Sequence, residues 1–338
     1  MQVPTEPFPI SHQAHFHRRW NHLTDPHVRT LAWLLDAPNL LDPDAAQWQG
    51  RIATLEPVNE KTESWLIDLD RMPAALHAYL NLQPFTRLGR YAEQLMAFYF
   101  SHQKILVGHG VQVRTDKNET IGEFDFLLRR GQELVHWEFA TKLYLLESSG
   151  HGRQADYFVG PNLADTLGVK IRKIMDRQLS LSRHPAAERH LPQPIVFAQA
   201  LVKGWLFYQE RMPSTERQMN LEVELPAGIA QAHCRGFWCP LEELDQLGSE
   251  NFLVLPRLSW LAPAKAADKD VMGKTALQAV LSTHFRQART PALVAVLARH
   301  GAQMLEVDRG FIVPDDWRNR AESRIRSGEK SGKQTHAE

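Results

Sequence analysis

Three carboxylates lie in a stretch of the sequence where their surroundings suggest a metal site. Glu93 falls in an amphipathic segment that is predicted to be a helix. Asp125 and Glu138 each lie between two aromatic residues, inside apolar runs that are typical of strands. Burying a carboxylate in such a run is costly unless a cation, a polar partner or a water-filled cleft replaces its hydration. Each of these positions therefore needs a chemical explanation.

Strand periodicity allows Asp125 and Glu138 to meet. Alternate residues of a strand share a face, so Glu123 accompanies Asp125, and Lys142 accompanies Glu138. If the two strands are neighbours, the two carboxylates can lie side by side. Adjacent carboxylates with carbonyl and water oxygens suit a hard divalent cation such as Mg²⁺. Such a cation would polarise a phosphoryl oxygen and activate a water, and Lys142 would stabilise the developing charge.

The same spacing has a purely structural interpretation. Asp125 and Glu138 could be a buried pair whose charge is satisfied by Arg114, Arg129 or His136. From the two positions alone, this alternative stays open.

The segments that must position the carboxylates read as helix, three strands, helix and strand. The turn residues at Arg130, Gly131 and Gln132 favour an antiparallel meander of the three strands. The predicted ranges, in chain order, are 88–100, 105–114, 121–129, 134–145, 162–181 and 195–208.

Several sequence segments resemble those of a bacterial family of unknown function, the domain-of-unknown-function 1853 family. They read GRYAEQL, GEFDFLL, VHWEFATKLYL and GPNLADTLGVKIRK. This resemblance extends from the first predicted helix to about residue 314. The order of the carboxylates, over 85–215, also resembles the PD-(D/E)XK nuclease superfamily.

The resemblance implies an α/β fold with a restriction-endonuclease-like core, in which helices flank a four-stranded mixed sheet. It implies that Asp125 and Glu138 hold Mg²⁺ or Mn²⁺, with the carbonyl of Phe139 as a further ligand. Glu93 would hold a water or a second metal. Asp125, Glu138 and Lys142 would then be the catalytic residues of a nuclease or phosphodiesterase that cleaves DNA or RNA.

One position departs from the superfamily pattern. The superfamily lysine stands two residues after the glutamate, where this chain has Ala140. Lys142 lies about 13 Å along the strand from Glu138. A β-bulge could restore its reach, Lys104 or Lys170 could replace it, or catalysis could be lost. The alternative function is therefore an inactive module on the same fold that binds nucleic acid or protein, or a structural protein.

The helix predicted over 162–181 carries a positive face. Lys170, Lys173 and Arg177 follow the i, i+3, i+7 spacing of one helix face. They could contact nucleic-acid phosphates beside the metal site, or form an ordinary solvated face.

Composition divides the chain into four parts. They are a helical N-terminal extension (1–84), the core (85–215), a mixed α/β region (216–316) and a polar tail (317–338). The tail is expected to be disordered. The mixed region is predicted to hold a strand at 252–255, helices at 275–288 and 291–300, and a hairpin or strand at 306–314 with Gly310 at its turn. The Gly/Ser segment 148–153 is predicted to be a connector, or else a flap.

Overall composition excludes several classes of protein. Lys and Arg number 39 and Asp and Glu number 39, so no overall basicity indicates nucleic acid or an anionic membrane. Two cysteines, Cys234 and Cys239, provide no disulfide framework, and no second pair completes a zinc site. We find no signal peptide and no membrane-spanning run, and we expect a cytoplasmic protein.

Overall fold

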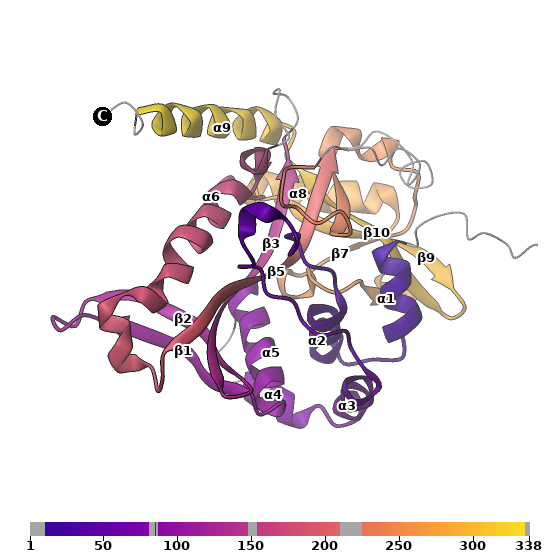
Figure 1. The fold of residues 1–338 in the computed structure, drawn as a ribbon. Coiled ribbons are helices and arrows are strands. Elements are labelled where there is room, and N and C mark those ends of the chain that lie inside the picture. Colours follow the sequence, from indigo (N-terminus) through magenta and orange to yellow (C-terminus); the bar gives the residue numbers. More distant parts are fainter. Residues whose placement is uncertain (1–10, 81–84, 86, 148–153, 210–224, 335–338) are drawn as a thin grey trace, which may run out of the picture.

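A computed structural model describes residues 11–80, 85, 87–147, 154–209 and 225–334, with side chains to residue 326. Within these residues, ten strands form one mixed sheet, in the order β1-β2-β3-β5-β6-β10-β9-β7, with β4 beside β3 and β8 beside β10 (Figure 1). Their bounds are β1 Leu106–Arg114, β2 Thr120–Arg130, β3 Glu133–Leu146, β4 Phe158–Val159, β5 Ile195–Gln209, β6 Cys234–Pro240, β7 Phe252–Val254, β8 Lys265–Ala266, β9 Ala292–His300 and β10 Gln303–Val313.

Helices cover both faces of this sheet. The N-terminal helices and α5 pack in one core with β3, β5 and β10, whereas α6 packs against the opposite face of β3 and β5. A third core lies under α8, against β6 and β9. The helices are α1 His12–Trp20, α2 Pro26–Asp36, α3 Glu60–Arg71, α4 Ala74–Leu80, α5 Leu88–His102, α6 Leu167–Arg172, α8 Lys274–Ala288 and α9 Trp317–Gln334. No helix of the described part has the length and apolar character that crossing a bilayer requires.

The predicted meander is confirmed. β1, β2 and β3 are consecutive and antiparallel, and β5 then adds to β3 in parallel. The turn between β2 and β3 contains Gly131 at φ 60°, a conformation that glycine adopts at little cost. The coarse prediction of a mixed sheet flanked by helices is therefore correct, although the sheet is larger than the four strands expected. It continues directly from β5 into β6, while the predicted domain boundary at 215/216 lies outside the described residues.

Two predictions for the C-terminal region are wrong. Residues 291–300 do not form a helix but strand β9, which lies between β10 and β7. The strand alternative for 306–314 is confirmed by β10, but Gly310 lies inside this strand and not at a turn. The turn between β9 and β10 falls at Gly301, where φ is 61°. The run 292–298 is almost continuously apolar, so it carries no period that separates a buried strand from a helix. What selects the strand is pairing with β10 and β7, which lie outside this run.

The helix predicted over 162–181 is also different. It begins at Leu167, where the Thr166 hydroxyl accepts a hydrogen bond from the Val169 amide as an N-cap. From Lys173 to Gln178 it becomes a π-helix, and it ends as a 3₁₀ turn over Leu179–Arg183. The i, i+3, i+7 rule for a single α-helical face therefore does not hold from Lys170 to Arg177. The segment 148–153 lies outside the described residues.

The expectation of a disordered tail from residue 317 is wrong, because this segment forms α9. Trp317 and Ala321 are fully buried, and Ile325 is buried too. The Trp317 indole donates a hydrogen bond to the carbonyl of Pro161 at 2.8 Å, and its ring lies 5.0 Å from that of Trp238. Three apolar side chains at a spacing of four residues are enough to fix a helix that is otherwise polar.

We predict that Trp317→Ala lowers the free energy of unfolding by about 3–5 kcal/mol, because it empties a buried aromatic site. The exposed Arg326→Ala on the same helix is the matched control and should change stability by at most about 0.5 kcal/mol. Chemical denaturation of both variants measures the difference. Equal stabilities would mean that α9 does not pack as described.

Candidate metal centre

Strands β2 and β3 separate at the predicted carboxylates. Their ladder runs from Arg130–Glu133 to Phe126–Trp137, and the same antiparallel register then places Asp125 across from Glu138. At this position β3 bonds to a side chain of β2 and not to its backbone, since Asp125 Oδ2 accepts a hydrogen bond from the Phe139 amide at 2.9 Å. Beyond this point β3 remains paired with β5. The sheet thus opens where the two acids stand.

The neighbouring strand β1 is bent at the same level. Gly110 lies across from Asp125, between the pairs His109–Phe126 and Val111–Phe124. Its φ of 62° favours glycine, and a Cβ atom there would lie 3.3 Å from Glu123 Oε1. This bend leaves room for a carboxylate beside the strand.

Three carboxylates meet in this opening, and we call them the acidic cluster: Glu93 from α5 with Glu123 and Asp125 from β2. One oxygen of each lies within 4.8 Å of the other two, and all three side chains are partly buried. Glu93 and Asp125 were predicted to face one site. Glu123 was not included, although the strand alternation that places it on the face of Asp125 could have identified it.

Glu138 borders the cluster and is held from two sides. It is 2% exposed, and its Oε1 lies 2.8 Å from His136 Nε2. Its other oxygen accepts a hydrogen bond from the Gln178 amide. Gln178 is the last residue of the π-helix, an element whose single turns often lie at functional sites. Sequence analysis did not identify Gln178, because only the fold brings it within reach.

His136 supports Glu138 as a neutral imidazole. Burial lowers the pKa of His136 to about 4, so the ring is neutral when its Nε2 shares a hydrogen bond with Glu138. Its Nδ1 is buried and has no hydrogen-bond partner among the described residues. Of the three residues that could have neutralised the carboxylates, only His136 contacts one of them. Arg114 instead donates to Gln112 and Asn118.

The electrostatics of this site are unfavourable to ionised acids. Burial, followed by the negative charge of Glu138, raises the pKa of Asp125 to about 8. Burial likewise raises the pKa of Glu138. No lysine or arginine of the described part forms an ion pair with either group. A divalent cation would supply the missing positive charge.

The rim of the acidic cluster carries two further groups. His109 Nε2 lies 2.8 Å from Glu93 Oε1, and its ring stacks on Phe126 with centroids 5.3 Å apart. Arg90 reaches Glu123 only at 4.0 Å and is exposed. Glu93 is therefore not an ordinary exposed helix residue, because a packed histidine holds it in place.

Lys142 lies further along β3 and is partly buried. Burial, followed by the charge of Lys170, lowers the pKa of its amine to about 8, and the nearby charges of Asp165 and Asp125 oppose this. Among the described residues, none forms an ion pair with Lys142. Its ammonium thus remains available to an anion near the acidic cluster.

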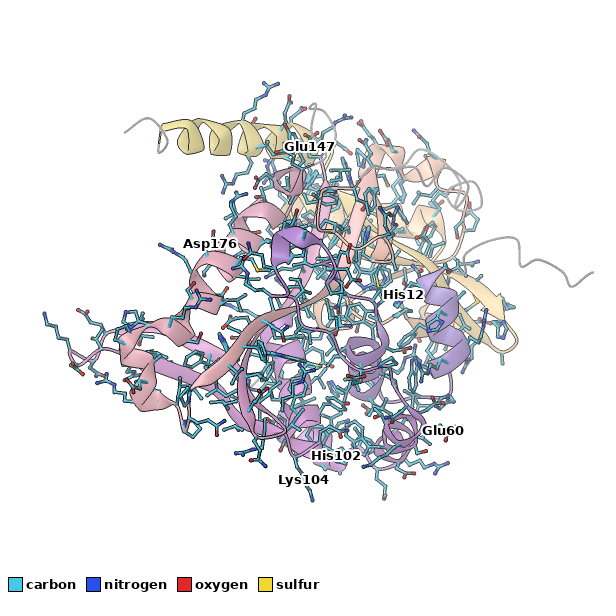
Figure 2. All side chains as sticks on the ribbon, viewed as in Figure 1. His12, Glu60, His102, Lys104, Glu147 and Asp176 are labelled. Atoms are coloured by element: carbon cyan, nitrogen blue, oxygen red, sulfur yellow. The ribbon has the colours of Figure 1, made fainter. Side chains whose placement is uncertain are left out.

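The other predicted basic residues differ in position. Lys170 forms an ion pair with Asp165 at 3.0 Å, whereas Lys173 and Arg177 are exposed. Lys104 lies at the far end of α5, about 16 Å along the helix axis from Glu93. Figure 2 shows it at one edge of the molecule beside His102, well apart from Asp176 of the π-helix. Lys104 is therefore the wrong candidate for the missing lysine.

The donor set fits a hard cation. The cluster offers only carboxylate oxygens, which suit Mg²⁺ or Mn²⁺ and lack the sulfur and imidazole ligands typical of zinc. Two imidazoles lie nearby, and each already contacts a carboxylate through its Nε2: His109 contacts Glu93, and His136 contacts Glu138.

The profile of a family described as a domain of unknown function (DUF1853) matches residues 29–313. Since this is most of the chain, the protein belongs to that family. No curated protein and no solved structure shows significant similarity to it. The family is thus established, whereas its place in a larger superfamily stays a prediction.

The raised pKa of Asp125 predicts how stability depends on pH. Between the usual carboxyl pKa near 4 and about 8, the folded protein keeps a proton that the unfolded chain releases. This contribution is complete below pH 4 and is lost as the pH rises through 8. Without divalent metal, Asp125→Asn should therefore gain stability relative to wild type as the pH rises.

Urea denaturation at several pH values measures this trend. Asp44→Asn, which neutralises an exposed carboxylate far from the cluster in sequence, is the control. A parallel pH dependence for Asp125→Asn and wild type would show that Asp125 is not buried among like charges.

Proposed function

We propose that this member of the DUF1853 family is a divalent-metal-dependent phosphodiesterase with a PD-(D/E)XK nuclease-like core, acting on nucleic acid. The observation that carries the proposal is the meeting of carboxylates from α5, β2 and β3 where two strands separate, beside an unpaired lysine. Helix, strand and strand supply these groups in the order that the superfamily uses.

The acidic cluster would hold the cation through Glu93, Glu123 and Asp125. When bound, Mg²⁺ or Mn²⁺ supplies Lewis acidity to a phosphoryl oxygen and lowers the pKa of a coordinated water. Asp125 is kept in place by the Phe139 amide, and Glu93 by His109. Rigid ligands of this kind keep a site ready for a metal without reorganisation.

The sequence predicts Glu138 to be a metal ligand, whereas here it borders the three ligands of the acidic cluster. Its two oxygens are held by His136 and Gln178 next to Asp125, and a bound cation would favour its ionised form. It adds negative charge beside the acidic cluster and strengthens the attraction for a divalent cation.

Lys142 would bind the substrate phosphate and stabilise its charge in the transition state. It has the role of the superfamily lysine from a position two residues later, with Ala140 in the usual place. The charges of Lys170 and Asp125 both act on the pKa of its amine, in opposite directions. Lys170 is held by Asp165 and would be a second, weaker phosphate contact.

A second function, an inactive module that binds nucleic acid, is favoured by one observation. The residue at the superfamily position is Ala140, which has no functional group. The two functions differ in what Lys142 does, so a substitution there separates them.

We predict cleavage of labelled DNA or RNA in Mg²⁺ or Mn²⁺ and none in EDTA. Asp125→Asn should abolish turnover, and Lys142→Met should reduce kcat by about 100- to 1000-fold, because it removes a charge aimed at the phosphate. Lys104→Met is the matched control and should leave kcat unchanged. Full activity of Lys142→Met would remove its assigned role. Absence of cleavage in wild type, with metal bound, would favour the binding module.

Cation binding should depend on the residue that the sequence did not identify. Glu123→Gln should weaken Mg²⁺ binding by at least about tenfold, because ligand charge sets affinity in such sites. Glu133→Gln, on an exposed glutamate at the start of β3, is the control. Isothermal titration calorimetry measures both, and equal affinities would exclude Glu123 as a ligand.

A further inference from the structure

A hollow of about 490 Å³ lies where α9 packs on the chain just before α6. It is lined by Leu163 on one side and by successive turns of α9 on the other, which contribute Asp316, Asn319, Arg320, Ser323 and Arg324. The last four are exposed. No part of the acidic cluster contributes to it, so it is a separate site.

The charge of this hollow is positive. Its lining holds two guanidinium groups, Arg320 and Arg324, and one carboxylate, Asp316. Arg289, outside the lining, also lies 3.6 Å from Asp316. Arg320 reaches Asp316 at 3.6 Å, and Arg324 donates to the Ala164 carbonyl at 3.3 Å. These contacts are long and few, and each guanidinium has five N–H donors. Most of these donors therefore face the hollow or the solvent.

The lining suits a phosphate. Two arginines one helical turn apart offer paired donors to phosphate oxygens, and the side-chain amide of Asn319 adds a neutral one. The Ser323 hydroxyl already donates to the Asn319 carbonyl. Leu163 gives the hollow an apolar wall without competing for the ligand.

The helical segment 167–183 connects this hollow to the acidic cluster. It begins next to Ala164, which Arg324 contacts, and it places Gln178 on Glu138. In Figure 1 it runs from beneath α9 toward the hairpin of β1 and β2. Fourteen residues separate Ala164 from Gln178. At the α-helical rise, which applies strictly to Leu167–Arg172 alone, this is on the order of 20 Å. The exposed Lys173 and Arg177 lie between them.

The distance between the hollow and the acidic cluster sets the minimum length of a ligand that contacts both. A mononucleotide is too short to contact both places, whereas about six phosphates of one DNA strand span about 20 Å. A single strand would be expected to stack on exposed aromatic rings. Along α6 and α9, the described residues offer no exposed aromatic ring, because Val169 is the only large apolar side chain exposed there. The surface therefore favours a duplex that is contacted through its backbone.

The form of α9 favours DNA over RNA. It is an 18-residue helix that is anchored at its start, where Arg318 lies 3.8 Å from the buried Glu147. Figure 2 shows Glu147 close to this end of α9. Its later turns extend past the body of the protein (Figure 1). An exposed helix fits the wide major groove of B-form DNA but not the narrow major groove of an A-form RNA duplex.

We propose that Arg320 and Arg324 of α9, with the hollow beside Leu163, form a backbone-binding site for duplex DNA that is about six nucleotides from the acidic cluster. This inference rests on the proposed function, because it takes the acidic cluster as the place where the same duplex is cut.

Binding of a labelled DNA duplex, measured by fluorescence anisotropy in EDTA over a range of salt concentrations, tests the site without any cleavage. R320Q/R324Q should bind about tenfold more weakly, and its slope of log K against log salt should be smaller by about 2, since two phosphate contacts are lost. R320K/R324K keeps both charges and should keep the wild-type slope. R71Q/R299Q removes two exposed arginines from α3 and β9, and it should bind like wild type.

The outcomes separate this inference from the proposed function. An unchanged affinity and slope for R320Q/R324Q, with its melting temperature intact, would overturn the α9 site and leave the nuclease proposal standing. Tighter wild-type binding to an RNA duplex or to a single strand would overturn the assignment to duplex DNA. Normal binding together with no cleavage in Mg²⁺ would support the α9 site while overturning the nuclease.

Discussion

Placing several carboxylates together inside a protein sheet costs free energy, because each loses hydration and each repels the others. Here the cost is concentrated where β2 and β3 separate, at Asp125 and Glu138. A backbone amide, a neutral histidine and a glutamine amide offset part of it through hydrogen bonds. Among the described residues, no lysine or arginine forms an ion pair with Asp125 or Glu138. The cation proposed for the acidic cluster would stabilise their ionised forms.

The surrounding elements are arranged around this opening. Gly110 bends β1 away from the side chains of β2, and the π-helix turns Gln178 toward Glu138. α5 presents Glu93 from outside the sheet, with His109 holding it in place. Each element departs from regular geometry, or adds a side-chain contact, at the level of the acids. Such departures are expected to cluster at sites where function constrains the backbone.

A buried charge pair joins β10 to β5 and to the segment before β8. Arg309 and Glu306 of β10 are both nearly inaccessible and lie 2.6 Å apart. Arg309 also donates to the carbonyls of Leu261 and Ala262, and it lies 4.2 Å from the ring centre of Trp205 on β5. With its charge and donors satisfied, this arginine ties β5, β10 and the segment before β8 into one unit. The same sheet therefore supports α6 and α9, and this keeps their relative position fixed.

The amino-acid sequence by itself determined the local elements around the site. Alternating and helical patterns predicted β1, β2, β3 and α5, and aromatic neighbours marked Asp125 and Glu138 as unusual acids. These are short-range properties, since the period of side chains along a strand or helix depends on nearby residues alone. The family likeness was visible for the same reason, in contiguous segments.

Only the tertiary structure decided which side chains meet and which segments become strands. Gln178 reaches Glu138 across 40 residues of sequence, and Glu93 meets Glu123 from a different element. Strand β9 was mistaken for a helix because its pairing with β10 and β7, rather than its own pattern, selects the strand. α9 was mistaken for a disordered tail because its few apolar side chains become stabilising only when Trp238 and the chain before α6 are in place to bury them. Burial and strand pairing are properties of the assembled fold, so residues far apart in the sequence had to be brought together before either could act.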